Sequence, residues 1–233
     1  MEPALNLGNS IFPELNAKRG LMICGYEWGF SKEDQRRENQ GVAHFFDPTA
    51  ITTFANKSAA HGERAFSWPY DNRVIKWFGL WGHPLNRAGL GSDFDKCVVQ
   101  TNWCNSGGNS IKENYFHKLT NKEQADNFIL HIEALDPSLI FFMGSSIIDI
   151  LQTPHILERF EQVLGKKASL PRKMQKSFAG RRFKIGFQSF GRCEVVSLPH
   201  PSGSHGVNDE YIALFNPEIS PLISAFKMAK NIS

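Results

Sequence analysis

The side chains best suited to chemistry in this 233-residue chain lie in short polar stretches, each directly after a short apolar run. Glu27 follows the first run, Asn102 the second and His200 the last. A carboxylate can stabilise a cation or orient a water, and a neutral imidazole can donate a hydrogen bond to a developing oxyanion. A carboxamide offers a donor and an acceptor for reading a ligand. Together these groups could form one polar site, although each of them alone is more often a structural residue.

The apolar runs predict buried strands, because each is too short for a helix and most are rich in β-branched or aromatic residues. Helical patterns lie between them, which is typical of a parallel sheet covered on both faces. Ligands bind beyond the carboxyl ends of such strands, so the three side chains are expected to meet around one pocket. The expected strands are Leu21–Cys24, Cys97–Gln100, Leu139–Phe142 and Val195–Leu198.

The connecting segments carry helix signals. Thr120 and Glu123 predict a capping box ahead of a helix over Ala125–Leu135. Pro221–Lys230 predicts a C-terminal helix, whereas Gly41–Gly91 is aromatic and irregular and is expected to form the walls of the site. Because no repeat or long linker divides the chain, residues 1–233 are expected to form a single domain.

The charge of the chain is unevenly distributed. The formal net charge is only +3, yet the segment Gly165–Lys184 contains no acidic residue. Such a segment attracts a polyanion, although a solvated basic loop without a partner explains it about equally well. Its charged residues are Lys166, Lys167, Arg172, Lys173, Lys176, Arg181, Arg182 and Lys184.

Composition argues against several classes of protein. No apolar run reaches the roughly 20 residues of a membrane helix, and the first ten residues lack the features of a secretory signal. A cytoplasmic monomer is therefore expected. The four cysteines are far apart, which argues against a zinc or iron–sulfur site and favours buried free thiols. We expect no metal and no cofactor.

The ordered motifs at the strand ends resemble those of the uracil-DNA glycosylase superfamily, most closely its single-strand-selective monofunctional branch. Gly25-Tyr26-Glu27-Trp28-Gly29 stands where that branch has G-M-N-P-G, and Gly41-Val42-Ala43-His44-Phe45-Phe46 resembles its G-V-P-F stretch with an extra residue. Asn102-Trp103-Cys104 is similar to N-L-C, and His200-Pro201-Ser202 matches H-P-S. The resemblance spans roughly residues 20 to 216.

This resemblance implies a three-layer α/β/α sandwich around a four-stranded parallel sheet, and a monofunctional DNA glycosylase that acts on a flipped base. Glu27 would stabilise the sugar cation and orient the water, where the classical uracil enzymes carry Asp and the single-strand-selective branch carries Asn. His200 would donate to the departing base and Asn102 would read its edge, with Phe45 or Phe46 stacked on it. Because no lysine lies in the motifs, we expect hydrolysis to an abasic site without a lyase step.

The first motif also bears on which base is removed. The classical uracil enzymes carry Tyr in place of Gly29, and its ring blocks the 5-position of the pyrimidine. Gly29 therefore predicts room for uracil or a 5-modified pyrimidine, with Trp28 filling that room or forming a new wall beside Tyr26. These departures, together with the basic insertion at about 165–184, suggest a bulky modified base of phage DNA and a role in defence.

Contacts with DNA are expected in two places. The loop after His200 matches the position of the family's wedge, where Val207 is the only apolar side chain, while Ser202 and Ser204 would hold phosphates. The basic segment would add further phosphate contacts through Lys166, Lys167, Arg172, Lys173, Arg181 and Arg182.

Two other functions remain open from the sequence. The same fold can bind DNA or a modified base without catalysis. A hydrolase of free nucleosides is the other, although a small neutral substrate needs no basic track. Neither the G-x-S-x-G elbow of serine hydrolases nor a G-x-G-x-x-G dinucleotide fingerprint occurs in the chain.

Overall fold

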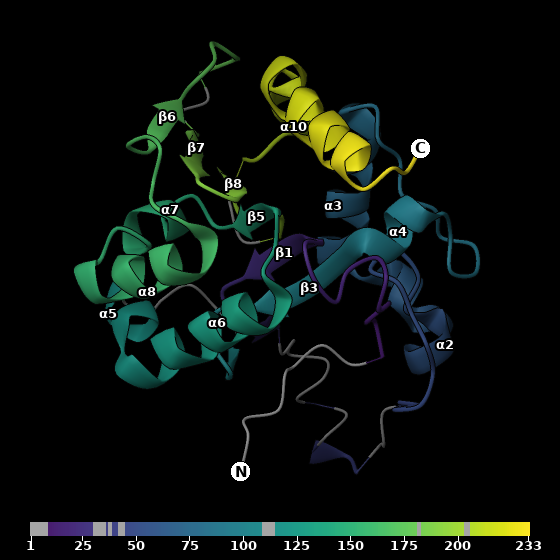
Figure 1. Ribbon diagram of the computed structural model, residues 1–233. Coiled ribbons are helices and arrows are strands. Elements are labelled where there is room, and N and C mark those ends of the chain that lie inside the picture. Colours follow the sequence, from purple (N-terminus) through teal and green to yellow (C-terminus); the bar gives the residue numbers. More distant parts are fainter. Residues whose placement is uncertain are drawn as a thin grey trace.

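The computed structural model describes residues 9–29, 36, 39–41, 45–108, 115–180, 183–202 and 206–233. At its centre is a six-stranded sheet with the order β3-β1-β5-β8-β7-β6 (Figure 1). Four neighbouring strands run parallel, and each contains one of the predicted apolar runs, except that Cys97 ends a helix instead. These strands are β1 (Leu21–Gly25), β3 (Val98–Asn102), β5 (Leu139–Met143) and β8 (Cys193–Leu198).

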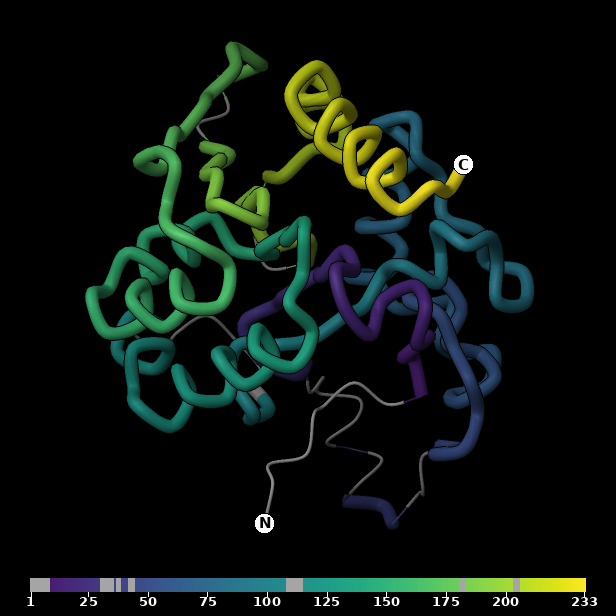
Figure 2. Tube along the Cα trace, viewed as in Figure 1, coloured from purple at the N-terminus to yellow at the C-terminus, as the bar shows by residue number. Residues whose placement is uncertain are grey.

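The prediction of a four-stranded sheet is wrong, because two further strands extend it. β7 (Ile185–Phe190) and β6 (Arg172–Met174) join β8 in antiparallel order. Gly186, Gln188 and Ser189 interrupt the apolar pattern of β7, and β6 is charged, as exposed edge strands often are. Part of the basic segment is thus the edge of the sheet, at the upper left of the chain trace (Figure 2).

A second, two-stranded parallel sheet lies close to the first motif. It pairs β2 (Trp28–Gly29) with β4 (Gly107–Gly108). The backbone N–H of Trp28 also donates to the carbonyl of Ser106 at 3.1 Å. This short ladder holds the chain that leaves β1 against the chain that leaves β3.

Helices pack on both faces of the main sheet. Along β1, Leu21 and Ile23 belong to one core cluster, and Met22 and Cys24 belong to the other, as alternating side chains of a strand buried on both faces should. The first cluster is covered by α3 (Pro69–Leu80), α4 (Asp93–Cys97), α9 (Asp209–Ala213) and α10 (Asn216–Ala229). The second is covered by α5 (Tyr115–Thr120), α6 (Lys122–Leu135), α7 (Ile147–Ile150) and α8 (Pro154–Leu164).

Two local predictions need correction. The side chain of Asn121, not that of Thr120, caps α6 by accepting from the N–H of Glu123, and the Thr120 hydroxyl donates to the carbonyl of Phe116. The stretch Gly41–Gly91 is not irregular throughout, because it contains α2 (Ser58–His61), the 3-10 helix η1 (Glu63–Ser67) and the twelve-residue α3. Pro69 stands at the start of α3, where a proline has no hydrogen bond to lose.

The C-terminal helix and the cysteines agree more closely with expectation. Helix α10 covers the predicted segment but begins earlier, at Asn216. All four cysteines are free and buried, and burial raises the pKa of the Cys97 thiol to about 11 and that of Cys104 to about 12. None of the helices formed by the described residues has both the length and the apolar character needed to cross a membrane.

Candidate active site

The ends of β1 and β3 lie side by side, because the parallel register pairs Gly25 with Asn102. A Cβ atom placed on Gly25 would lie 2.5 Å from Oδ1 of Asn102. The amide therefore lies across the end of β1, where only a glycine leaves room for it. Asn102 is 5% exposed, so its side chain sits at the bottom of the candidate site rather than at its rim.

His200 lies between two tyrosine rings. Its ring centroid is 6.0 Å from that of Tyr26, in a stacked arrangement, and 5.5 Å from that of Tyr70. Tyr70 stands in the first turn of α3, and its Oη lies 3.6 Å from the Cβ position of Gly25. Tyr70 therefore spans the space between the Asn102 end of the site and His200.

The sequence did not predict that the hydroxyl of Tyr70 belongs to the site. Its oxygen is buried, and the side chain of Gln100 lies close enough to hydrogen-bond with it and partly offset the effect of burial on its pKa. Burial also raises the pKa of this phenol well above its usual value, so the group remains a neutral donor at physiological pH. Since Tyr70 lies in the stretch predicted to wall the site, its aromatic character was the only available signal.

The imidazole of His200 is uncharged near neutral pH. Burial lowers its pKa from 6.5 to about 4. The hydroxyl of Ser202 lies 3.4 Å from Nδ1 of His200, a contact in which either atom can donate. A neutral imidazole can donate a hydrogen bond without first losing a proton, as the predicted role requires.

Tyr26 joins the third strand end to the same site. Its hydroxyl lies 2.9 Å from the hydroxyl of Ser146, and a Cβ placed on Gly144 would lie 2.2 Å from its ring. Gly144 follows β5 directly, so this close approach explains why a glycine is needed there. The structure thus brings the ends of all four parallel strands together around Tyr26, Asn102 and His200.

Glu27 is buried beside this group but faces α5. Its carboxylate, 8% exposed, accepts hydrogen bonds from the hydroxyls of Ser106 and Tyr115 at 3.2 Å each and forms an ion pair with Lys118. Tyr115 in turn packs on Tyr26, with ring centroids 4.8 Å apart. Glu27 is therefore linked to His200 through two tyrosine rings.

Lys118 and Tyr115 were not predicted from the sequence. They stand three residues apart in α5, so they share one face of that helix. This spacing is the only indication in the sequence that the two residues act together. It does not predict that they contact Glu27, which follows β1. Lys118 lies outside the four motifs, yet it contacts Glu27 directly.

The two phenylalanines expected to stack on the base lie elsewhere in this structure. Phe45 and Phe46 are 62% and 54% exposed. Phe46 packs against His61, with centroids 5.0 Å apart, and His61 meets Trp68 at 4.9 Å. In the part of the chain described here, the aromatic rings that contact His200 are those of Tyr26 and Tyr70.

The specificity residues of the first motif stand at the surface. Trp28 is partly exposed, and Gly29 is exposed. Among the described residues, no atom lies within 4 Å of the position that a Cβ on Gly29 would occupy.

Several expected DNA contacts change in the light of the structure. Val207 is buried in the core, so it does not fit the role of an exposed wedge. Ser202 is exposed beside His200, whereas Ser204, Arg181 and Arg182 lie outside the described residues.

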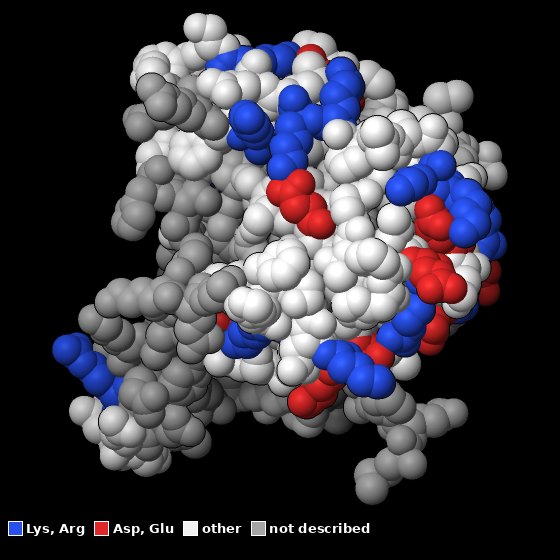
Figure 3. Space-filling model, turned by 90° about the vertical axis from the view of Figure 1, so that its left-hand side faces the viewer, with Lys and Arg blue, Asp and Glu red and all other residues white. Residues whose placement is uncertain are grey.

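The basic segment is less positive than its sequence suggests. Lys and Arg side chains gather near the top of the molecule in Figure 3, with acidic side chains close to some of them. Ion pairs join Lys166 to Glu161, Lys173 to Asp149 and Lys176 to Glu218. The backbone N–H of Lys167 also donates to Glu161, and Arg172 lies over the ring of Phe187. Each of these three ion pairs matches one lysine with one carboxylate, which weakens the segment as a track for DNA.

A further buried charge lies near the site. Lys57 forms an ion pair with Asp71 at 2.8 Å and a hydrogen bond to the side chain of Gln100. Asp71 follows Tyr70 in α3, and Gln100 precedes Asn102 by two residues, on the same face of β3. This cluster fixes the first turn of α3 against β3 and so helps to place Tyr70.

Buried histidines make the stability of the fold depend on pH. His131 is fully buried, its Nδ1 lies 2.7 Å from the Thr101 hydroxyl, and burial lowers its pKa from 6.5 to about 4. Below pH 6.5 the unfolded chain binds a proton that the folded chain excludes, so stability falls between pH 6.5 and 4. We expect His131 alone to remove roughly 2 kcal/mol between pH 7 and pH 5.

Urea unfolding at the two pH values measures this effect. His131→Gln should show a smaller loss of unfolding free energy on acidification than the parent chain, even though it starts from lower stability. An equal loss in both proteins would contradict the assignment. His200 adds to the fall in the same pH window, since its pKa shifts in the same direction.

No protein-family model matches the chain, and no curated protein is significantly similar to it. What the chain does must therefore be inferred from the geometry of this site. The site offers a neutral imidazole, a buried amide, tyrosine rings and a buried carboxylate at one edge of a mostly parallel sheet.

Proposed function

We propose that the chain is a DNA glycosylase of the uracil-DNA glycosylase type, built on a three-layer α/β/α sandwich. It hydrolyses the N-glycosidic bond of a flipped uracil or 5-modified pyrimidine and leaves an abasic site. The observation that carries this proposal is the pairing of a neutral His200 with a buried Asn102, with Tyr70 between them. This arrangement suits a flat heterocycle with polar edges.

The polar groups divide the work of holding the base. The amide of Asn102 supplies one donor and one acceptor to the pyrimidine edge. The buried hydroxyl of Tyr70 adds a further group that can donate to the base. Tyr26 or Tyr70 supplies the aromatic surface for stacking, in place of Phe45 and Phe46.

The reaction separates charge, and the site has a group for each half. As the bond from C1′ to the base breaks, its electron pair leaves with the base, and His200 donates a hydrogen bond to the oxygen where negative charge collects. Glu27 stabilises the positive charge on the sugar. Water adds to C1′ and its proton passes to solvent, so that the products are the free base and an abasic strand.

Lys118 keeps this reaction hydrolytic. A lysine can form a covalent intermediate with the sugar only as a neutral amine. The ion pair with Glu27 holds Lys118 as an ammonium ion.

The open space at Gly29 favours a base with a large 5-substituent, such as 5-hydroxymethyluracil or a bulky modified cytosine of phage DNA. Incubating the protein with oligonucleotides that each contain one such base, followed by alkali, would convert abasic sites into strand breaks. We expect cleavage with at least one 5-substituted pyrimidine and none with unmodified DNA. Absence of cleavage for every base would contradict the enzyme assignment.

A non-catalytic reader of DNA or of modified bases is the second candidate. The three bonds that already occupy the Glu27 carboxylate favour it, because they restrain the group from serving a water. Tight, base-dependent binding to modified DNA without release of the base would support this candidate over the glycosylase.

A further inference from the structure

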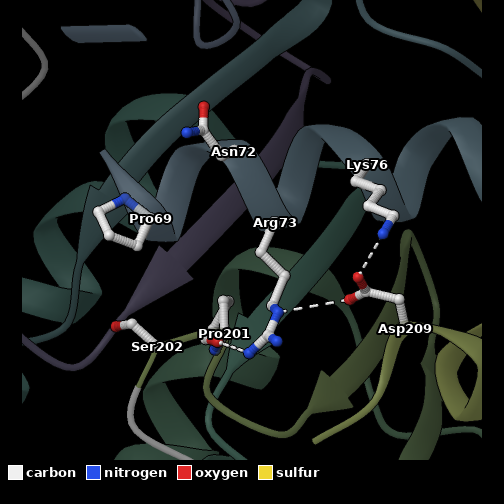
Figure 4. Close-up of a pocket in the computed structure, with 7 residues that line it drawn as sticks. All are labelled: Pro69, Asn72, Arg73, Lys76, Pro201, Ser202 and Asp209. Carbon is white, nitrogen blue, oxygen red and sulfur yellow. Dashed lines mark hydrogen bonds and ion pairs between the residues drawn. The ribbon is translucent and has the colours of Figure 1, made fainter. Parts of the chain in front are cut away.

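A pocket of about 520 Å³ lies beside Pro201 and Ser202, the two residues that follow His200. It is formed by α3, by Pro201 and Ser202, and by Asp209 at the start of α9 (Figure 4). Pro69, which also lines it, directly precedes Tyr70. The pocket and the candidate site therefore share both the His200 loop and the start of α3.

Two cations in this pocket share one carboxylate. Arg73 Nε lies 3.3 Å from Oδ1 of Asp209, and Lys76 Nζ lies 2.7 Å from its Oδ2 (Figure 4). The indole N–H of Trp77 donates to Oδ1 at 2.9 Å. The three charged residues that line the pocket thus leave it with an excess of one positive charge, in contrast to the paired lysines of the basic segment.

Arg73 also links the pocket to Pro201, the residue that follows His200. Its Nη1 donates to the carbonyl of Pro201 at 2.6 Å. The exposed hydroxyl of Ser202 stands at the same opening and reaches back to His200. A charged group bound in this pocket would therefore lie beside Pro201 and Ser202. These residues directly follow His200, which we propose as the hydrogen-bond donor to the departing base.

We propose that this pocket binds a phosphodiester group of the DNA strand whose base enters the candidate site, with Arg73 and Lys76 as its ligands. The proposal rests on the proposed function. Arginine presents a planar fork of donors that fits phosphate oxygens, and lysine adds a point charge. Asp209 forms ion pairs with both Arg73 and Lys76 in the free protein. A phosphate must therefore displace the Asp209 carboxylate, and this competition lowers the affinity for DNA.

The test removes the charge of Asp209 while keeping its hydrogen bond with the indole of Trp77. Asp209→Asn retains an oxygen for the Trp77 indole but removes the competing charge. Binding to a fluorescein-labelled oligonucleotide, measured across a series of salt concentrations, should tighten roughly three- to tenfold. Its salt dependence should steepen by about one phosphate contact. Lys76→Gln, at a largely exposed lysine, should weaken binding and reduce that dependence.

Asp126→Asn provides a matched control. Asp126 also pairs with two cations, Lys122 and Arg159, and its replacement changes the net charge equally. It stands in α6, on the opposite face of the sheet. We expect a much smaller gain in affinity from this variant.

Equal gains from Asp209→Asn and Asp126→Asn would overturn the pocket as a phosphate site, since they would show only the effect of net charge. Unchanged binding in Lys76→Gln would overturn it as well. If base release persists under those results, the proposed function stands and only the pocket fails. If the parent chain neither binds DNA nor releases a base, both proposals fail together.

Discussion

His200→Ala is expected to lower the rate of base release by roughly a hundredfold or more, while the affinity for DNA changes little. The buried, uncharged imidazole is the group proposed to donate to the departing base, and alanine leaves that oxygen without a donor. Single-turnover rates with saturating protein separate this chemical step from binding. The exposed histidine His155, at the start of α8, provides the control, since His155→Ala should react at the parental rate.

The pH profile adds a second readout for His200. Because the pKa of this imidazole is about 4, we expect its neutral form to support base release at a constant rate down to about pH 5. A parental rate in His200→Ala would remove the imidazole from the mechanism. Loss of DNA binding with an unchanged chemical rate would assign it to the DNA contact instead.

Glu27→Gln is expected to slow base release by roughly 100- to 1,000-fold. Glutamine keeps an oxygen for the hydroxyls of Ser106 and Tyr115 but removes the charge that stabilises the sugar cation. It also breaks the ion pair between Glu27 and Lys118, so the structural cost must be measured separately. Thermal unfolding of the variant, compared with the parent, provides that measurement.

Lys118→Met separates the two roles of the ion pair. If Glu27 acts on the sugar, its carboxylate remains in Lys118→Met and the rate should fall much less than in Glu27→Gln. Equal losses in the two variants, together with equal losses of stability, would make the pair a structural feature. Full activity in a folded Glu27→Gln protein would favour a role for Glu27 in holding α5 only.

The sequence predicted those parts of the fold that leave a strong local pattern. Buried parallel strands are continuous apolar runs, so β1, β3, β5 and β8 could be identified, and topology then placed their exits at one edge. β7 has no such run, because Gly186 and two polar residues interrupt it. Its strand character depends on pairing with β8, which no local pattern encodes.

The candidate site was only partly predictable for a similar reason. Asn102 and His200 sit in the strand exits, so their proximity followed from topology. Tyr70 arrives from a helix in a segment that had been interpreted as irregular, and Lys118 arrives from α5. Both reach the site only through tertiary packing.

The corrected residues show the limits of carrying roles over by position. Phe45 and Phe46 were assigned from motif order, yet their packing partners lie around His61. The wedge role was assigned to Val207 because it is the only apolar residue of its loop. Its side chain is instead buried in the hydrophobic core. A motif does not specify whether a side chain is buried. Phe45 and Phe46 are exposed here, whereas Val207 is buried.

The most direct test of the central claim is a mass measurement of both products from one reaction on DNA that carries a single 5-substituted pyrimidine. We predict equal amounts of free base and of an intact abasic strand, no protein–DNA adduct after borohydride treatment, and initial rates of both products roughly a hundredfold lower with His200→Ala. Intact substrate with the parent protein, recovered under conditions in which the DNA is fully bound, would contradict the claim that these side chains surround a base in order to release it.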